Sequence, residues 1–169
     1  MIKQIIIDEI KEEEKEEVRR ILVESYQQYA HSYTNHDLWI EYLSNIKASV
    51  DNPDVDKILV AKSNQQILGT LQLFESSEKA YQRPELNIFS PIIRLLAVHP
   101  TARGRGVAQE LLKAGAEYAK SKGATKLYLH SGDRMSKAIR LYEWLGYKRD
   151  HSKEFMNNDI LVKCFRLDL

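Results

Sequence analysis

Apolar residues in the first half of the chain show two kinds of spacing, one typical of helices and one typical of strands. A spacing of three and four residues predicts a helix over 12–29 and a second helix from Leu38 that ends before Asn52. The polar stretch 75–91 contains two prolines and predicts an irregular loop, which we interpret as a flexible loop beside an active site. Short β-type runs predict three strands, and a polar turn joins the last two as a hairpin: residues 2–7, 58–61 and 67–74.

The second half has the order strand, helix, strand, which is typical of two parallel strands joined by a right-handed crossover. No repeat or linker interrupts the chain, so we expect one domain over residues 1–169, of the α/β class and the α+β type. The predicted elements are a buried strand at 92–98, a helix from near Arg103 to Gly123, a strand at 125–130, a helix that ends at Gly146, and strands at 147–156 and 160–168.

Composition narrows the class of protein. The chain has 169 residues, of which 43% are hydrophobic and 29% charged, values typical of a globular domain that buries its own core. Its single cysteine, Cys164, excludes an internal disulfide, and no apolar run approaches the roughly 18 residues of a membrane helix. The five histidines show no metal-ligand spacing. We therefore expect a cytoplasmic protein with no metal and no membrane attachment.

Charge is distributed unevenly along the chain. The net charge is only +1, yet residues 100–149 contain eleven basic and four acidic side chains. Such a basic segment indicates either a local anionic ligand or a solvated helix face. A nucleic acid is the disfavoured ligand, because the segment has few aromatic residues on which bases would stack.

One segment offers a site for a phosphate. From Val98 to Ala108 a strand end leads through a glycine-bearing loop into a helix, whose first amides have no partner within the helix. Glycines let the backbone approach an anion, and Arg103 and Arg105 add positive charge. The alternative is a tight turn with surface arginines. The segment lacks the Gly-Lys-Ser/Thr ending of a P-loop and the full GxGxxG dinucleotide fingerprint.

Two motifs in the second half resemble the GNAT superfamily of acyl-CoA-dependent N-acetyltransferases. The first motif is Arg/Gln-x-x-Gly-x-Gly/Ala at a helix start, and the second is an alanine followed by Leu-Tyr-Glu and then Gly-Phe/Tyr. They correspond here to Arg103, Gly106 and Ala108, and to Ala138, Leu141-Tyr142-Glu143 and Gly146-Tyr147. The resemblance implies a mixed, mostly antiparallel sheet with splayed central parallel strands and about four helices.

The resemblance also implies acetyl-CoA as cosubstrate, bound between the splayed strands. Tyr142 then lies near the sulfur and protonates the leaving thiolate as general acid. Its spacing from Ile139 and Leu145 fits a core residue equally well. The implied cofactor-binding residues are Leu96, Ala97 and Val98 for the pantetheine arm, Arg103, Gly104, Arg105, Gly106, Val107 and Ala108 for the pyrophosphate, and Ser136.

The sequence departs from the family pattern at two positions. Met135 stands where the family often has asparagine, and the neighbouring Ser136 is the candidate replacement. Ile92 stands where many members carry a glutamate, so the general base is not identified. The base therefore stays open among a water molecule and four side chains: Glu75, Glu85, His130 and Asp133.

We predict an N-acetyltransferase that moves an acetyl group from acetyl-CoA to a primary amine of a small molecule or peptide by direct attack. The alternative is a catalytically silent acyl-CoA-binding module with a regulatory or interaction role. Aromatic residues around the first two helices are either an acceptor pocket or ordinary core: Tyr26, Tyr29, His31, Tyr33 and Trp39. The acceptor, the acyl chain and the oligomeric state, including a homodimer, stay open.

Overall fold

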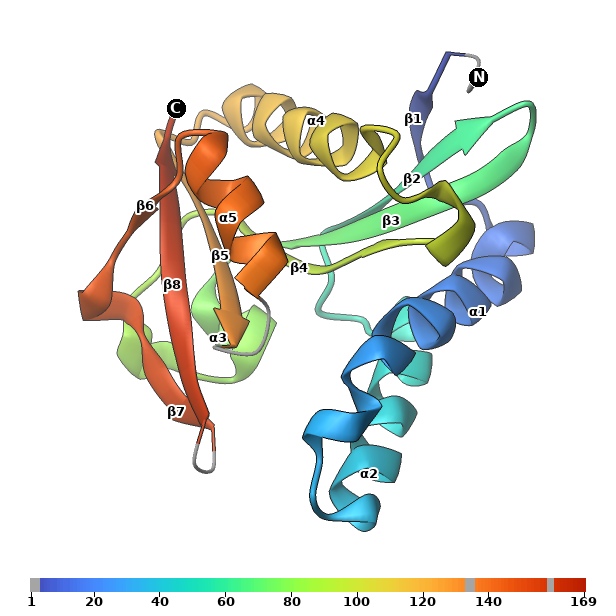
Figure 1. Ribbon diagram of the computed structural model, residues 1–169. Coiled ribbons are helices and arrows are strands. Elements are labelled where there is room, and N and C mark those ends of the chain that lie inside the picture. The colour runs from blue at the N-terminus through green and yellow to red at the C-terminus, as the bar shows by residue number, and fades with distance from the viewer. Residues whose placement is uncertain (1–3, 133–135, 158–159) are drawn as a thin grey trace. The chain divides into compact units, whose positions relative to one another are not determined.

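The computed structural model describes residues 4–132, 136–157 and 160–169 (Figure 1). The strands in this part of the chain are β1 Ile6–Glu9, β2 Lys57–Ser63, β3 Gln66–Phe74, β4 Ile92–Val98, β5 Lys126–Gly132, β6 Lys148–Arg149, β7 Phe155–Asn157 and β8 Ile160–Asp168. The α-helices are α1 Lys15–Tyr26, α2 His36–Ala48, α3 Ser77–Tyr81, α4 Val107–Ser121 and α5 Ser136–Trp144.

The strands form one mixed sheet in the order β1-β2-β3-β4-β5-β8-β6, with β7 paired to β8. This confirms the predicted mixed α/β fold class. β4 and β5 are parallel, and their register pairs Ile92 with Tyr128 and Ile93 with Leu129. Shortly after these pairs, Leu95 adopts a φ of +51°, a left-handed conformation that interrupts the regular strand geometry.

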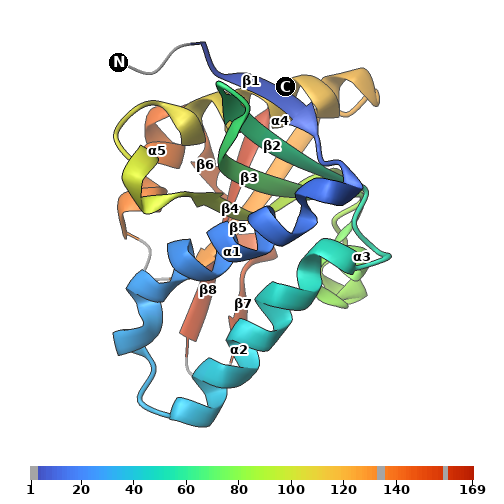
Figure 2. The same ribbon diagram turned by 90° about the vertical axis from the view of Figure 1, so that its right-hand side faces the viewer.

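By its internal contacts the chain divides into two compact units, residues 1–72 with 95–115 and residues 73–94 with 116–169. In the first unit β1 runs antiparallel to β2, and a turn with positive φ at Asn64 leads from β2 into β3, as the hairpin pattern predicts. α1 and α2 lie side by side (Figure 2). The Asn35 side chain accepts the first backbone N–H groups of α2, which explains where that helix begins.

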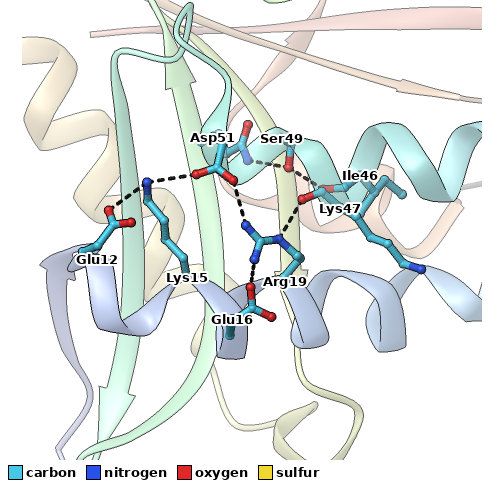
Figure 3. Close-up of polar contacts among 9 residues, drawn as sticks. Glu12, Lys15, Glu16, Arg19, Ile46, Lys47, Ser49 and Asp51 are labelled. Atoms are coloured by element: carbon cyan, nitrogen blue, oxygen red, sulfur yellow. Dashed lines mark hydrogen bonds and ion pairs between the residues drawn. The ribbon is translucent and has the colours of Figure 1, made fainter.

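Ionic contacts attach α1 to the turn that follows α2 (Figure 3). Asp51 accepts hydrogen bonds from Lys15 Nζ at 3.0 Å and from Arg19 Nη2 at 2.8 Å, and Arg19 Nε donates to the Lys47 carbonyl at 3.0 Å. The hydrogen bond from Lys15 is the largest of the effects that lower the Asp51 pKa below its ordinary value. This network fixes the end of α1 that is remote from the candidate site.

Gly69 explains how closely β3 approaches its neighbours in the first unit. A Cβ at this position would lie 2.7 Å from the Ala97 carbonyl oxygen and 3.0 Å from Val107 Cγ1. Only glycine therefore lets β3 lie so near both β4 and the first residue of α4. The hairpin of β2 and β3 thus packs closely against both ends of the segment that joins β4 to α4.

In the second unit β5 and β8 form a long antiparallel pair. Their register runs from Lys126 opposite Asp168 to Gly132 opposite Val162. The prediction of one continuous strand over 147–156 is wrong, because a 3-10 turn at His151–Lys153 separates β6 from β7. The Asp150 side chain accepts the Ser152 N–H and so stabilises that turn in place of strand pairing.

Two other expectations need correction. The stretch 75–91 is not irregular throughout: α3 lies within it, capped by the Ser76 hydroxyl, and Leu86 and Ile88 are buried. α4 begins at Val107 and not near Arg103, because the chain first makes a 3-10 turn at Pro100–Ala102. Of the strand predicted at 2–7, the first two residues lie outside the described part of the chain, and β1 extends to Glu9.

Candidate active site

The segment between β4 and α4 has an accessible backbone. Gly104 and Gly106 adopt φ values of +76° and +81°, and no heavy atom lies within 4 Å of a Cβ built on either residue. Both glycines are exposed, and Gly106 immediately precedes α4, a helix of fifteen residues. Free helix amides and the positive end of the helix dipole therefore face an open surface, an arrangement that fits a pyrophosphate.

Near the end of β4 the backbone N–H and C=O groups point alternately towards β3 and away from it. The His99 N–H donates to the Leu68 carbonyl of β3 at 2.8 Å, and the Ala97 carbonyl also lies against β3. Because backbone groups alternate along a strand, those of Leu96 and Val98 point away from β3. Of the three residues predicted to bind a pantetheine arm, these two have the orientation that strand-like addition requires.

The charged residues of the loop differ in their surroundings. Arg103 Nη2 donates to the Ser25 carbonyl at 3.2 Å, so this guanidinium is attached to α1. Arg105 is exposed, and Val107 is buried beneath the helix start. The structure thus brings together, within the first unit, all the predicted cofactor residues except Ser136.

Ser136 and Tyr142 belong to α5 in the second unit. Ser136 is exposed at the first residue of the helix, whereas Tyr142 is only 7% exposed. The Tyr142 ring lies 6.0 Å from that of Tyr147 and 6.1 Å from that of Phe165. Tyr142 therefore has the packing of a core residue, and its role as general acid stays a prediction.

The candidate bases differ in their environments. Glu75 lies 3.8 Å from Lys122, and Glu85 lies 3.6 Å from Arg83; both carboxylates are well exposed. His130 is partly buried, and its Nε2–H donates to the Lys153 carbonyl at 2.9 Å. Asp133 lies outside the described residues.

His130 is the most distinctive of these candidates. Burial lowers its pKa to about 4, and the ring of Tyr81 lies 4.8 Å away. Its Nδ1 atom is buried and has no hydrogen-bond partner among the described residues. Because Nε2 carries the proton, Nδ1 presents a lone pair on a neutral imidazole at neutral pH.

The aromatic residues of the first unit form a continuous cluster. The Tyr33 ring lies 5.1 Å from Trp39 and 5.6 Å from Tyr42, and Tyr42 lies 6.2 Å from Tyr26. Tyr42 joins the residues that the sequence predicts for this cluster, and its position three residues after Trp39 places both on one helix face. Trp39 and Tyr26 are buried, which favours a core role for that part of the cluster.

Within residues 4–132, 136–157 and 160–169, no group of three or more histidine, cysteine, aspartate or glutamate side chains could hold a metal ion. In the same part of the chain, none of the helices combines the length and apolar composition needed to cross a bilayer.

Comparison with known proteins identifies the family. The acetyltransferase (GNAT) family profile matches residues 15–147, and the chain belongs to this family. The rat protein N-acetyltransferase 8B is 29% identical over 90 residues, which cover 53% of this chain and 38% of that protein. The match thus spans well under half of this curated relative's length.

Solved structures share the fold. The PaiA N-acetyltransferase of Thermoplasma acidophilum, in complex with coenzyme A, gives a TM-score of 0.71 at 18% identity and covers 99% of this chain and 100% of that one. A GNAT family acetyltransferase of Brucella melitensis, in complex with acetyl-CoA, gives 0.64 at 17% identity, with 98% and 88% covered.

Proposed function

We propose that the chain is an acyl-CoA-dependent N-acetyltransferase and that residues 1–169 act as one catalytic domain. The observation that supports this most directly is the open glycine backbone at Gly104 and Gly106, which precedes a long helix in a member of the GNAT family. The coenzyme A and acetyl-CoA complexes of structural neighbours support the same cosubstrate. The acceptor we propose is a primary amine of a small molecule or peptide.

The residues of the first unit have binding roles in this proposal. The backbone groups of Leu96 and Val98 bind the pantetheine arm along the edge of β4 that faces away from β3. The amides of residues 103–108 bind the pyrophosphate, and the guanidinium groups of Arg103 and Arg105 add attraction for its charge. Acetyl-CoA supplies an activated thioester when bound.

Acid–base chemistry falls to the second unit. An amine attacks a thioester only when it is neutral, and alkyl amines have an ordinary pKa of about 10.4, so a proton must be removed at neutral pH. The acceptor of that proton stays open among a water molecule, Glu75, Glu85, His130 and Asp133, because the Nδ1 atom of His130 is buried and the pKa of the ring is lowered to about 4. Tyr142 protonates the leaving thiolate, and a strand amide near Val98 stabilises negative charge on the thioester oxygen.

A second candidate function keeps the binding site without catalysis. Ile92, which stands where many family members have a glutamate, is completely buried and has no group that accepts a proton. This observation favours an acyl-CoA-binding module with a regulatory or interaction role.

The deciding experiment measures both binding and turnover. Calorimetry with acetyl-CoA should give saturable binding, and a panel of primary amines should include acceptors that accelerate thiol release above hydrolysis. Binding without acceleration by any small-molecule or peptide amine would favour the silent module. Absence of acetyl-CoA binding to the folded protein would contradict both candidate functions.

We expect Gly106→Ala to weaken acetyl-CoA binding by about 10-fold or more, because the new methyl group and the displaced backbone remove charge-assisted amide contacts of about 1.5–3 kcal/mol each. The measurement is the calorimetric dissociation constant. Gly123→Ala is the matched control, since Gly123 has a φ of +83° and the same open surroundings but follows α4. Both variants should lose a similar 1–2 kcal/mol of stability, roughly the cost of a left-handed alanine. An equal effect of both on binding would contradict the assignment.

A further inference from the structure

Three consecutive residues at the C-terminal end of α1 contact three successive parts of the segment from β4 to the glycine loop. The Tyr26 hydroxyl donates to the Leu96 carbonyl at 3.3 Å. The Glu24 carboxylate lies 2.9 Å from His99 Nε2. The Ser25 carbonyl accepts from Arg103 at 3.2 Å. We call residues 24–26 the α1 clamp.

The geometry of a helix makes this arrangement specific. Glu24 and Tyr26 contact the segment through their side chains, whereas Ser25 does so through its backbone carbonyl, which points along the helix axis towards the C-terminal end. Ser25 and Tyr26 are 5% and 7% exposed and so belong to the core of the first unit, whereas the Glu24 side chain is 40% exposed. The carbonyls at a helix C-terminus carry partial negative charge, which favours the guanidinium of Arg103 there.

Each contact acts on a group with a proposed binding role or on its immediate neighbour. The Leu96 carbonyl lies on the edge of β4 that faces away from β3, so the Tyr26 hydroxyl fixes the orientation of the peptide group that the pantetheine arm would meet. His99 Nδ1 accepts the Thr101 N–H at 3.2 Å, so Nε2 carries the ring proton and donates it to Glu24. Glu24 thereby holds the residue that begins the loop.

We propose that the α1 clamp positions the acetyl-CoA-binding segment and that Glu24 and Tyr26 are positioning residues for cofactor binding. The inference rests on the proposed function. Preorganisation is the physical reason: a segment already held in its binding geometry loses less conformational freedom when the ligand binds. Removal of a clamp contact should therefore weaken acetyl-CoA binding although neither side chain needs to touch the ligand.

The α1 clamp also contacts the aromatic cluster of the first unit. The Tyr26 ring packs 5.8 Å from Tyr29 and 6.2 Å from Tyr42, so the same residue joins the aromatic cluster to β4. A shift of this cluster would reach the Leu96 carbonyl through Tyr26. The clamp thus links the first two helices to the binding segment within one unit.

The test compares acetyl-CoA affinity, measured by calorimetry, with the urea-unfolding midpoint of the free protein. Tyr26→Phe keeps the ring and removes only the hydroxyl, and we expect it to weaken binding about 2- to 10-fold, the usual range for one neutral hydrogen bond. Glu24→Ala should weaken binding to a similar extent. Glu24→Gln should restore most of the affinity, because an amide oxygen also accepts from His99 Nε2–H.

A double-mutant cycle separates positioning from a general loss of stability. Glu24→Ala and His99→Ala should together weaken binding no more than the stronger single variant, since both remove the same contact. The control is Glu16→Ala on the same helix, whose carboxylate pairs with Arg19 in the network at the other end of α1, and its affinity should equal that of the wild type.

The outcomes distinguish this inference from the function on which it rests. Wild-type affinity in Tyr26→Phe and Glu24→Ala, with or without a lower unfolding midpoint, would overturn the clamp and leave the proposed function intact. Additive effects in the cycle, or an equal loss in Glu16→Ala, would also overturn it. A wild-type protein that binds no acetyl-CoA would overturn the proposed function and the inference with it.

Discussion

Tyr142→Phe should lower kcat for acetyl transfer by about 100- to 10,000-fold while the dissociation constant of acetyl-CoA changes little. General acids contribute rate factors of this size, and the substitution removes the only proton that the side chain can donate. The ring remains to pack against Tyr147 and Phe165, so the fold should persist. Steady-state thiol release with a saturating acceptor amine, together with calorimetry, measures the two quantities.

Tyr147→Phe is the matched control for that variant. Tyr147 lies in the same ring cluster, and its buried hydroxyl has no hydrogen-bond partner among the described residues. Removal of this hydroxyl should leave kcat unchanged and stabilise the protein slightly, because an unsatisfied buried polar group is costly. A Tyr142→Phe enzyme with wild-type kcat would show that Tyr142 is a core residue only.

The second large effect concerns stability against pH. The pKa of His130, about 4 in the folded protein, lies below the ordinary value of 6.5, so between these values the unfolded chain binds a proton that the folded chain does not. Stability should therefore fall as the pH decreases from 6.5 towards 4. At about 1.4 kcal/mol per pH unit between the two pKa values, the total loss is on the order of 3 kcal/mol.

Urea unfolding of the wild type and of His130→Gln between pH 4 and pH 7.5 tests this expectation. Glutamine does not titrate and can still donate to the Lys153 carbonyl, so the variant should show a much flatter pH dependence in this window. Carboxylates with lowered pKa values, such as Asp51 and Glu154, lose their contributions mainly below their ordinary pKa and do so in both proteins. Parallel pH profiles would show that His130 is not buried in its neutral form.

The parts of the fold that could be predicted from the sequence are those that depend on residues close together in the chain. The hairpin of β2 and β3 follows from two apolar runs and a turn, and Gly123 and Gly146 have the positive φ values expected where helices end. α3 escaped prediction because it has only five residues and too few turns to show a helical period. The break between β6 and β7 depends on an Asp150 side chain that replaces strand pairing, a choice that residue periodicity does not encode.

The candidate site likewise has a part that the sequence predicts and a part that it does not. The glycine loop was predictable because its residue types are contiguous in sequence and each has a local conformational reason. The contacts of Glu24 and Tyr26 with that segment were not, because they join residues that only the folded chain brings together. The environment of His130 was not predictable either. Its ring contacts the Lys153 carbonyl and the Tyr81 ring, and no spacing within the sequence identifies these neighbours.

The α1 clamp also sets an order of events during synthesis. Tyr26 and its partner Leu96 are 70 residues apart, and Ser25 and Arg103 are 78 apart. A ribosome that adds about 5–20 residues per second therefore completes α1 several seconds before the partners of its C-terminal end exist. Until then that end is exposed, and closing so long a loop has an entropic cost. The segment from β4 to the glycine loop is thus a late product of folding, and a nascent chain gains the proposed cofactor site only after its first helix contacts residues made much later.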